Sequence, residues 1–289
     1  MNGVVAAVIS SALGGSAAAL TRYVIGQSDP VTLAAFRFGI GFVIVFPLAL
    51  AAGVKFPQGK DRLVVAGLGV LFFAFFFFLY NIAMSLTSAA RGSLALSVLP
   101  LTTMLLAALL GREALTRRKT LGVLIAIAGV AVALYAGLAQ APPGAWRGDF
   151  IMAAATLCMA FYNVWSRPLM VRSSMLGFLA TGMGFGAAAS VLLAWLGGGF
   201  AATLQFGAPQ WIAVLCLGIF GGAAAFYLWV YALERTTPTR VANTMTVNPI
   251  AASLLAAALV GEPLGVHLVF GVAAVAAGIW LASSAPRQR

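Results

Sequence analysis

Polar-tipped side chains inside long apolar runs are the residues of this chain best suited to chemistry. They occur in pairs, each within one run: Tyr80 and Asn81, Asn163 and Trp165, Tyr227 and Trp229, Asn243 and Asn248. A buried amide, hydroxyl or indole N–H must find a hydrogen-bonding partner, because leaving it unpaired costs about 1–3 kcal/mol. Aromatic faces beside such groups predict a site for a small molecule that has an apolar part and polar ends.

A second polar set surrounds two prolines that also lie inside apolar runs. Ser93, Ser97 and Pro100 follow a spacing of four and three residues, which places them on one helical face. Pro100 and Pro249 each free the carbonyl four residues earlier, so each is expected to kink its helix and expose backbone to a cavity. The serines have an alternative role, which is to hydrogen-bond neighbouring helices together. We interpret this set as a moving gate.

The ionisable residues favour binding over catalysis. All six acids fall at the ends of apolar runs or in loops, so no buried proton relay is predicted. Glu113 and Glu262 are interpreted as turn residues that cap the next helix. Arg37 lies inside a run and could meet a carboxylate, although donation to carbonyls near a helix end is the favoured interpretation. With one histidine, no HExxH motif and two cysteines among apolar neighbours, we predict no enzyme, no metal and no cofactor.

The elements that carry these residues belong to a membrane. Hydrophobic residues make up 62% of the 289 and charged ones 8%, with a mean hydropathy of +1.03. The apolar residues are continuous and do not alternate with polar ones, which predicts helices and excludes barrel strands. Ten runs are long enough to span a bilayer, near residues 3–25, 31–53, 63–86, 92–111, 120–139, 149–166, 174–196, 209–232, 241–260 and 265–284. We therefore predict an all-α integral membrane protein with ten transmembrane helices.

The chain repeats itself with a shift of 149 residues. The stretch Arg91 to Glu113, RGSLALSVLPLTTMLLAALLGRE, is matched without a gap by RVANTMTVNPIAASLLAAALVGE, Arg240 to Glu262. Pro100 falls on Pro249, and the same register pairs Phe77 with Phe226 and Tyr80 with Trp229. A register of 145 relates the earlier parts of the two halves, pairing Arg22 with Arg167, Gly39 with Gly184 and Gly41 with Gly186. The duplication predicts two units of five helices, residues 1–140 and 147–289, joined by a Pro/Gly linker.

An odd number of crossings in each unit inverts the second unit relative to the first. The basic residues agree, because only Arg22, Arg37, Arg91 and Arg147 of the 17 Lys and Arg fall on the side opposite the N-terminus. The positive-inside rule then places both termini in the cytoplasm. A net charge of +11 spread in this way also argues against nucleic-acid binding, which needs a basic soluble face. Inverted repeats are the usual build of secondary transporters that bind substrate near the membrane midplane.

Three short motifs resemble a known family. LAAFRF (Leu33 to Phe38), LLGREALT (Leu109 to Thr116) and LVGEPLG (Leu259 to Gly265) are similar to the EamA repeats of the drug/metabolite transporter superfamily. Within that superfamily the chain most resembles the YddG-type amino acid exporters of bacterial inner membranes. The resemblance covers essentially the whole chain. It implies a basket in which spans 1–4 and 6–9 surround a central cavity, with spans 5 and 10 outside.

Together these features predict a multi-pass transporter of a bacterial inner membrane, a monomer or a homodimer, that works by alternating access. The expected substrates are small neutral or zwitterionic metabolites, and the resemblance implies aromatic and other apolar amino acids. The lack of a carboxylate within the spans suggests facilitated diffusion or weak proton coupling. Export of drugs or other metabolites, a passive channel and a structural membrane protein are the alternatives.

Overall fold

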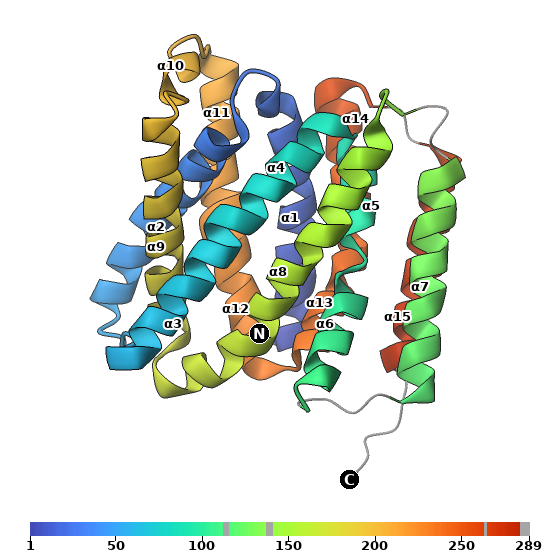
Figure 1. Cartoon of the computed structure of the whole chain (residues 1–289), viewed down its shortest axis with the longest axis horizontal. Coiled ribbons are helices and arrows are strands. Elements are labelled where there is room, and N and C mark those ends of the chain that lie inside the picture. Colours follow the sequence, from blue (N-terminus) through green and yellow to red (C-terminus); the bar gives the residue numbers. More distant parts are fainter. Residues whose placement is uncertain (112–115, 137–140, 263–264, 284–289) are drawn as a thin grey trace.

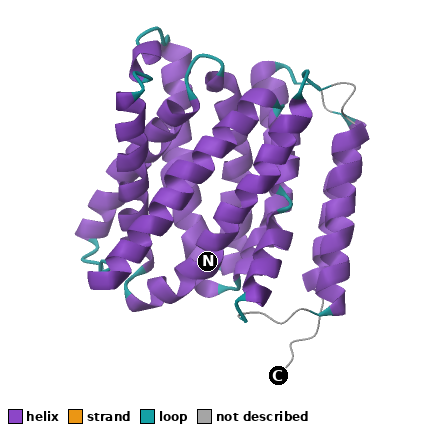
Figure 2. Cartoon of the chain, viewed as in Figure 1, coloured by secondary structure: helices purple, strands orange, loops and turns teal. Residues whose placement is uncertain are grey.

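The computed structural model describes residues 1–111, 116–136, 141–262 and 265–283. Helices joined by short loops make up this part of the chain, and it contains no strand (Figure 2). Long helices run back and forth between two ends of the molecule (Figure 1). The all-α prediction is therefore confirmed for the described residues.

The helices of the two halves follow a similar order. The first half contains α1 (Gly3–Ile25), α2 (Pro30–Ala51), α3 (Gly59–Gly69), the π-helix η1 (Val70–Phe76), α4 (Phe77–Leu86), α5 (Ala89–Leu96), α6 (Leu99–Leu109) and α7 (Arg117–Ala136). The second half contains α8 (Ala145–Arg172), α9 (Met175–Leu196), α10 (Phe200–Thr203), α11 (Ala208–Cys216), the π-helix η3 (Leu217–Ala224), α12 (Ala225–Arg235), α13 (Pro238–Asn243), the 3₁₀-helix η4 (Thr244–Thr246), α14 (Val247–Val260) and α15 (Val266–Ser283).

Seven helical stretches of the described residues are long and apolar enough to cross a membrane. They are Gly3–Ile25, Pro30–Ala51, Gly59–Leu86, Ala89–Leu109, Met175–Leu196, Ala208–Arg235 and Pro238–Val260. The other three predicted runs lie in α7, α8 and α15, which have 20, 28 and 18 residues. That these also cross the membrane stays a prediction, and with it the total of ten spans.

Side-chain caps fix where several helices begin, and they recur between the halves. The side chain of Asp29 accepts from two backbone N–H groups of α2, and the Ser174 hydroxyl accepts from one of α9, that of Gly177. Ser88 caps α5, and Thr237 caps α13. The first two caps are 145 residues apart and the second two 149, which are the two registers of the sequence repeat. The duplication thus extends to the residues that begin the helices.

The two π-helices also occupy matching positions. In the register of 149 residues, η3 (217–224) corresponds to residues 68–75, which overlap η1 (70–76). Each packs tightly against a helix of the other half. A Cβ at Gly69, just before η1, would overlap the carbonyl oxygen of Gly182 in α9, and a Cβ at Gly222 in η3 would lie 2.5 Å from the carbonyl oxygen of Arg37 in α2. The halves are therefore interleaved, with glycines where their backbones approach most closely.

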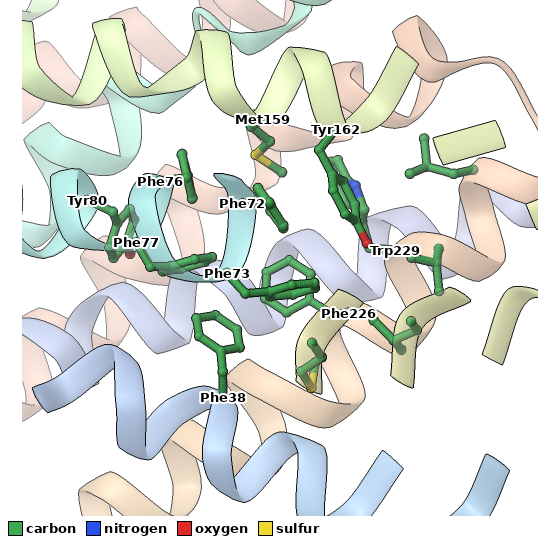
Figure 3. Packing of buried hydrophobic residues seen from close by; sticks show 14 of the residues in the cluster. Phe38, Phe72, Phe73, Phe76, Phe77, Tyr80, Met159, Tyr162, Phe226 and Trp229 are labelled. Atoms are coloured by element: carbon green, nitrogen blue, oxygen red, sulfur yellow. The ribbon is translucent and has the colours of Figure 1, made fainter. Parts of the chain in front are cut away.

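The remaining helices are arranged around this crossing. α1 contacts α12 and α14, and α4 contacts α8, so the core lies between elements of both halves. α7 and α15 pack against each other at one edge of the molecule (Figure 1). The largest cluster of buried apolar residues is rich in phenylalanine and lies between α2, η1, α4, α8 and α12 (Figure 3).

Candidate functional site

A small cavity lies where these central helices meet. Its lining residues come from α1, α2, η1, α4, α5, α8, α12, η4 and α14, and none comes from the described parts of α7 or α15. The cavity has a volume of about 30 Å³, which gives room for only one or two water molecules. Pockets that bind small ligands usually measure about 300–1,000 Å³. The structure therefore shows a closed state, and a ligand larger than water requires the walls to move apart.

The cavity wall is mainly aromatic, and its rings come in pairs related by the repeat. Phe77 of α4 and Phe226 of α12 meet edge to face with their centroids 5.8 Å apart. Tyr80 and Trp229, the next pair in the register of 149 residues, also line the cavity and are 4% and 1% exposed. Figure 3 shows these rings with Phe38 between η1, α2, α8 and α12. Equivalent residues of the two halves thus face one central volume.

Several buried polar atoms beside these rings lack a partner. Trp229 Nε1 donates to Asn163 Oδ1 over 2.9 Å, but Asn163 Nδ2 makes no hydrogen bond. The Tyr162 hydroxyl, on the neighbouring residue of α8, also has none. Asn248 lines the cavity, with Nδ2 3.6 Å from the Met245 sulfur and Oδ1 unpaired. Because unpaired buried polar groups are costly and uncommon, this cluster indicates a site that water or a ligand completes.

Among the described residues that line the cavity, only Arg37 carries a charge. Its side chain is 4% exposed, and its Nε and Nη2 donate to the Gly221 carbonyl over 3.2 and 2.8 Å. The guanidinium carbon lies 4.4 Å from the Phe77 ring centroid and 5.9 Å from those of Tyr80 and Phe226. As expected from the sequence, Arg37 bonds to a carbonyl. That carbonyl belongs to η3 in the other half, however. The Arg37 side chain is therefore buried between the two halves and does not extend to the membrane–water interface.

The structure brings four of the eight predicted binding residues together. Tyr80, Trp229 and Asn248 line the cavity, and Asn163 bonds directly to Trp229. A hydrogen bond from Asn81 Nδ2 to the Pro30 carbonyl, 2.7 Å long, joins α4 to the start of α2.

The other three predicted binding residues lie elsewhere. Trp165 stacks on Phe161, which is 39% exposed, so this ring pair lies toward the outer side of α8. Tyr227 is 39% exposed and lies 6.3 Å from the ring of Tyr231 on the outer side of α12. Asn243 is buried at the end of α13, where its carbonyl accepts from the Thr246 hydroxyl.

The two prolines lie beside breaks in their helices, where the sequence predicted kinks. α5 ends at Leu96, and Pro100 is the second residue of α6. In the second half, η4 separates α13 from α14, and Pro249 is the third residue of α14. Each proline thus lies in a first turn, where its missing N–H has no intrahelical partner to lose. The Ser97 hydroxyl donates within its own helix to the Ser93 carbonyl, and the Ser93 hydroxyl makes no hydrogen bond.

Comparison with known proteins identifies the family. Residues 1–135 and again 146–284 match the family described as EamA-like transporters. The chain belongs to the EamA-like transporter family. The family assignment from the sequence motifs is confirmed, and the two matches divide the chain into nearly the same halves as the repeat.

Related proteins are transporters of bacteria and archaea. The chain is 30% identical over 247 residues to the aromatic amino acid exporter YddG of Ancylobacter novellus, which covers 83% of each protein. It is 28% identical over 235 residues to a probable terminal-alkyne amino-acid exporter of Streptantibioticus cattleyicolor, covering 79% of this chain and 77% of that one. A transporter of Bacillus subtilis, YyaM, is 24% identical over 272 residues, covering 93% and 89%. One crystal structure is similar with a TM-score of 0.71 and 26% identity, covering 96% of this chain and 95% of the other. The chain is therefore a membrane transporter.

Two clusters of charge tie this EamA-like transporter together away from the cavity, and sequence reasoning missed both. Asp149 accepts from Arg91 Nη2 at 2.5 Å and from the Thr87 hydroxyl at 2.9 Å, while Arg91 Nη1 donates to the Leu134 carbonyl. The side chains of Arg91 and Asp149 are 4% and 10% exposed, so a buried carboxylate exists, although it does not line the cavity. A groove of about 490 Å³ between α5, α7 and α8 reaches this pair. The predicted topology places both residues at run ends on the same side, but it does not specify that they pair.

The second cluster corrects the interpretation of Glu262. Its carboxylate accepts from the backbone N–H of Ala89, with both oxygens 3.1 Å away, and lies 3.7 Å from Arg22 Nε. Glu262 therefore caps α5 of the first half, where a cap of the following helix was predicted. The N-terminal dipole of α5 and the Arg22 charge both favour a carboxylate at this point. Glu113, its counterpart in the repeat, lies outside the described residues.

Proposed function

We propose that this transporter exports small neutral or zwitterionic metabolites across the inner membrane of a bacterium, with aromatic and other apolar amino acids as preferred substrates. The observation that carries the proposal is the central cavity whose wall pairs Phe77 with Phe226 and Tyr80 with Trp229. Such rings suit an apolar side chain, while unpaired amide atoms nearby suit polar ends. Two relatives are named as exporters of amino acids, one of them of aromatic ones.

The proposed architecture has ten spans in two inverted units, residues 1–140 and 147–289, with both termini in the cytoplasm. Two family matches, the paired helix caps and the paired π-helices support the duplication. The start of α1 and the end of α15 lie at the same end of the molecule (Figure 1), as an even number of crossings requires. Inversion follows from five crossings in each unit.

The proposed mechanism is alternating access. A cavity of about 30 Å³ cannot hold an amino acid, so its walls must move apart to admit substrate, and in this mechanism one side opens while the other stays closed. The broken helices α5/α6 and α13/η4/α14 supply one candidate gate in each half, around Pro100 and Pro249. The contact of Glu262 with Ala89 and Arg22 joins the two halves at the end opposite the N-terminus, so it is expected to open when substrate leaves the cell.

Transport into reconstituted liposomes tests the proposal. Vesicles that contain the protein should take up labelled phenylalanine faster than empty vesicles, and uptake should saturate with concentration. Labelled threonine, alanine and cationic drugs in the same assay define the substrate class. Amino acid uptake no faster than in empty vesicles would overturn the proposal. Uptake that rises linearly without saturating would favour a passive channel.

A further inference from the structure

The charge of Arg37 has no carboxylate partner among the described residues. In the described part of the chain, the carboxylates that form ion pairs do so with four other arginines, Arg22, Arg91, Arg172 and Arg235. A charge so fully removed from water is expensive to keep inside a membrane protein, and such residues are usually paired or face a ligand pathway. Aromatic faces offset part of this cost, because four rings surround the guanidinium within 6 Å.

The hydrogen bonds of Arg37 to protein carbonyls leave one of its donor groups unused. Nε and Nη2 both donate to the Gly221 carbonyl, which holds the plane of the guanidinium in place. Gly221 allows this approach, because a Cβ there would lie 2.7 Å from the Ala17 Cβ and 3.4 Å from Arg37 Nη2. Nη1 is buried and makes no hydrogen bond. A fixed, desolvated cation with unused N–H groups is suited to bind an anionic oxygen.

An acceptor lies across the same cavity. Asn248 Oδ1 is buried without a hydrogen bond, on a residue that is 2% exposed and that lines the cavity from α14. An ammonium group carries three donors and no acceptor, so an unpaired amide oxygen suits it. One cavity therefore offers a free cationic donor on α2, a free oxygen on α14 and aromatic rings between other helices.

We propose that Arg37 holds the carboxylate of the transported amino acid through Nη1, while Asn248 Oδ1 accepts from its ammonium group. The proposal rests on the function proposed above and names the groups that recognise the zwitterion. The site forms fully when the cavity widens, since the closed state has room only for water. Arg37 has a glycine, Gly182, at its place in the second half, so the anion-binding group exists in one half only.

Two analogues that lack one charged end test this assignment. Uptake of labelled phenylalanine into liposomes is measured with unlabelled phenylalanine or phenethylamine as competitor, the latter lacking the carboxylate. For the wild-type protein, phenethylamine should compete about tenfold more weakly or worse, as expected for a lost charge-assisted hydrogen bond. The measured ratio is the phenethylamine concentration that halves uptake divided by the phenylalanine concentration that does so. In Arg37→Gln this ratio should fall toward one, and in Arg37→Lys it should be partly restored. 3-Phenylpropionate, which lacks the ammonium group, should compete more weakly than phenylalanine for the wild-type protein. In Asn248→Ala the two compounds should compete about equally.

A matched control is Arg147→Gln. Arg147 is exposed, with its guanidinium over the Trp146 ring at 5.4 Å, and this variant should keep the wild-type ratio. Equal competition by phenylalanine and phenethylamine in the wild type would overturn the role of Arg37 while leaving amino acid transport intact. An undiminished ratio in a folded Arg37→Gln protein would do the same. Absence of any amino acid uptake by the wild type would overturn the proposed function together with this assignment.

Discussion

The buried ion pair between Arg91 and Asp149 makes a quantitative prediction for Asp149→Asn. The substitution keeps the shape of the side chain but removes its charge, so Arg91 stays buried without a counter-charge, although it keeps its hydrogen bond to the Leu134 carbonyl. Leaving one charge of a buried pair uncompensated usually costs about 3–5 kcal/mol. Because the Asp149 side chain is still 10% exposed, we expect the lower end, about 3 kcal/mol. Denaturant-induced unfolding in mixed detergent and lipid micelles measures this loss.

The double variant Arg91→Met/Asp149→Asn distinguishes the cost of an unpaired buried charge from the cost of changing the side chains. It removes both charges, so it should be more stable than Asp149→Asn alone. The matched control is Asp61→Asn, which breaks the exposed pair between Asp61 and Arg172 and should leave the unfolding midpoint unchanged. A wild-type midpoint for Asp149→Asn, or a double variant whose loss equals the sum of the single losses, would refute the reasoning.

Three further predictions follow from the same structure. Gly69→Ala should lower the yield of folded protein, because the new Cβ would overlap the Gly182 carbonyl. Gly67→Ala, which has open space around its Cβ, should not, and gel filtration compares the monodispersity of the two variants. Trp229→Phe removes the indole N–H that donates to Asn163 and should reduce phenylalanine uptake several-fold, which corresponds to about 1 kcal/mol for one hydrogen bond. Tyr227→Phe, at an exposed position, should match the wild type. A pH gradient alone should not concentrate phenylalanine inside vesicles, because the described lining of the cavity contains no carboxylate; gradient-driven accumulation would contradict this.

The sequence predicted best where the repeat supplied two independent copies of a signal. Tyr80 and Trp229 were chosen as register partners, and both line the cavity. The same register pairs Phe77 with Phe226, whose rings also meet there, although neither belongs to the predicted site. Both pairs of residues related by the repeat therefore meet at one cavity.

The differences between the predicted and the observed arrangement have two physical causes. Tyr227 and Trp165 lie two residues from Trp229 and Asn163, respectively, which is about 200° around a helix, so they lie on another face. The burial of Arg37 at the centre and the pairing of Asp149 with Arg91 depend on how helices distant in sequence approach one another. No local pattern specifies such contacts.

At Gly69 and Gly222 the backbones of the two halves are in direct contact, which limits how the chain can be assembled from separate fragments. Gly69 of the first half is covered by Gly182 of the second, and Gly222 of the second is covered by the backbone at Arg37 of the first. Each half alone would thus leave a strip of uncovered backbone that only the other half covers. A fragment ending at the central linker is expected to be insoluble or aggregated by itself, and co-expression of the two fragments should be required to recover either one.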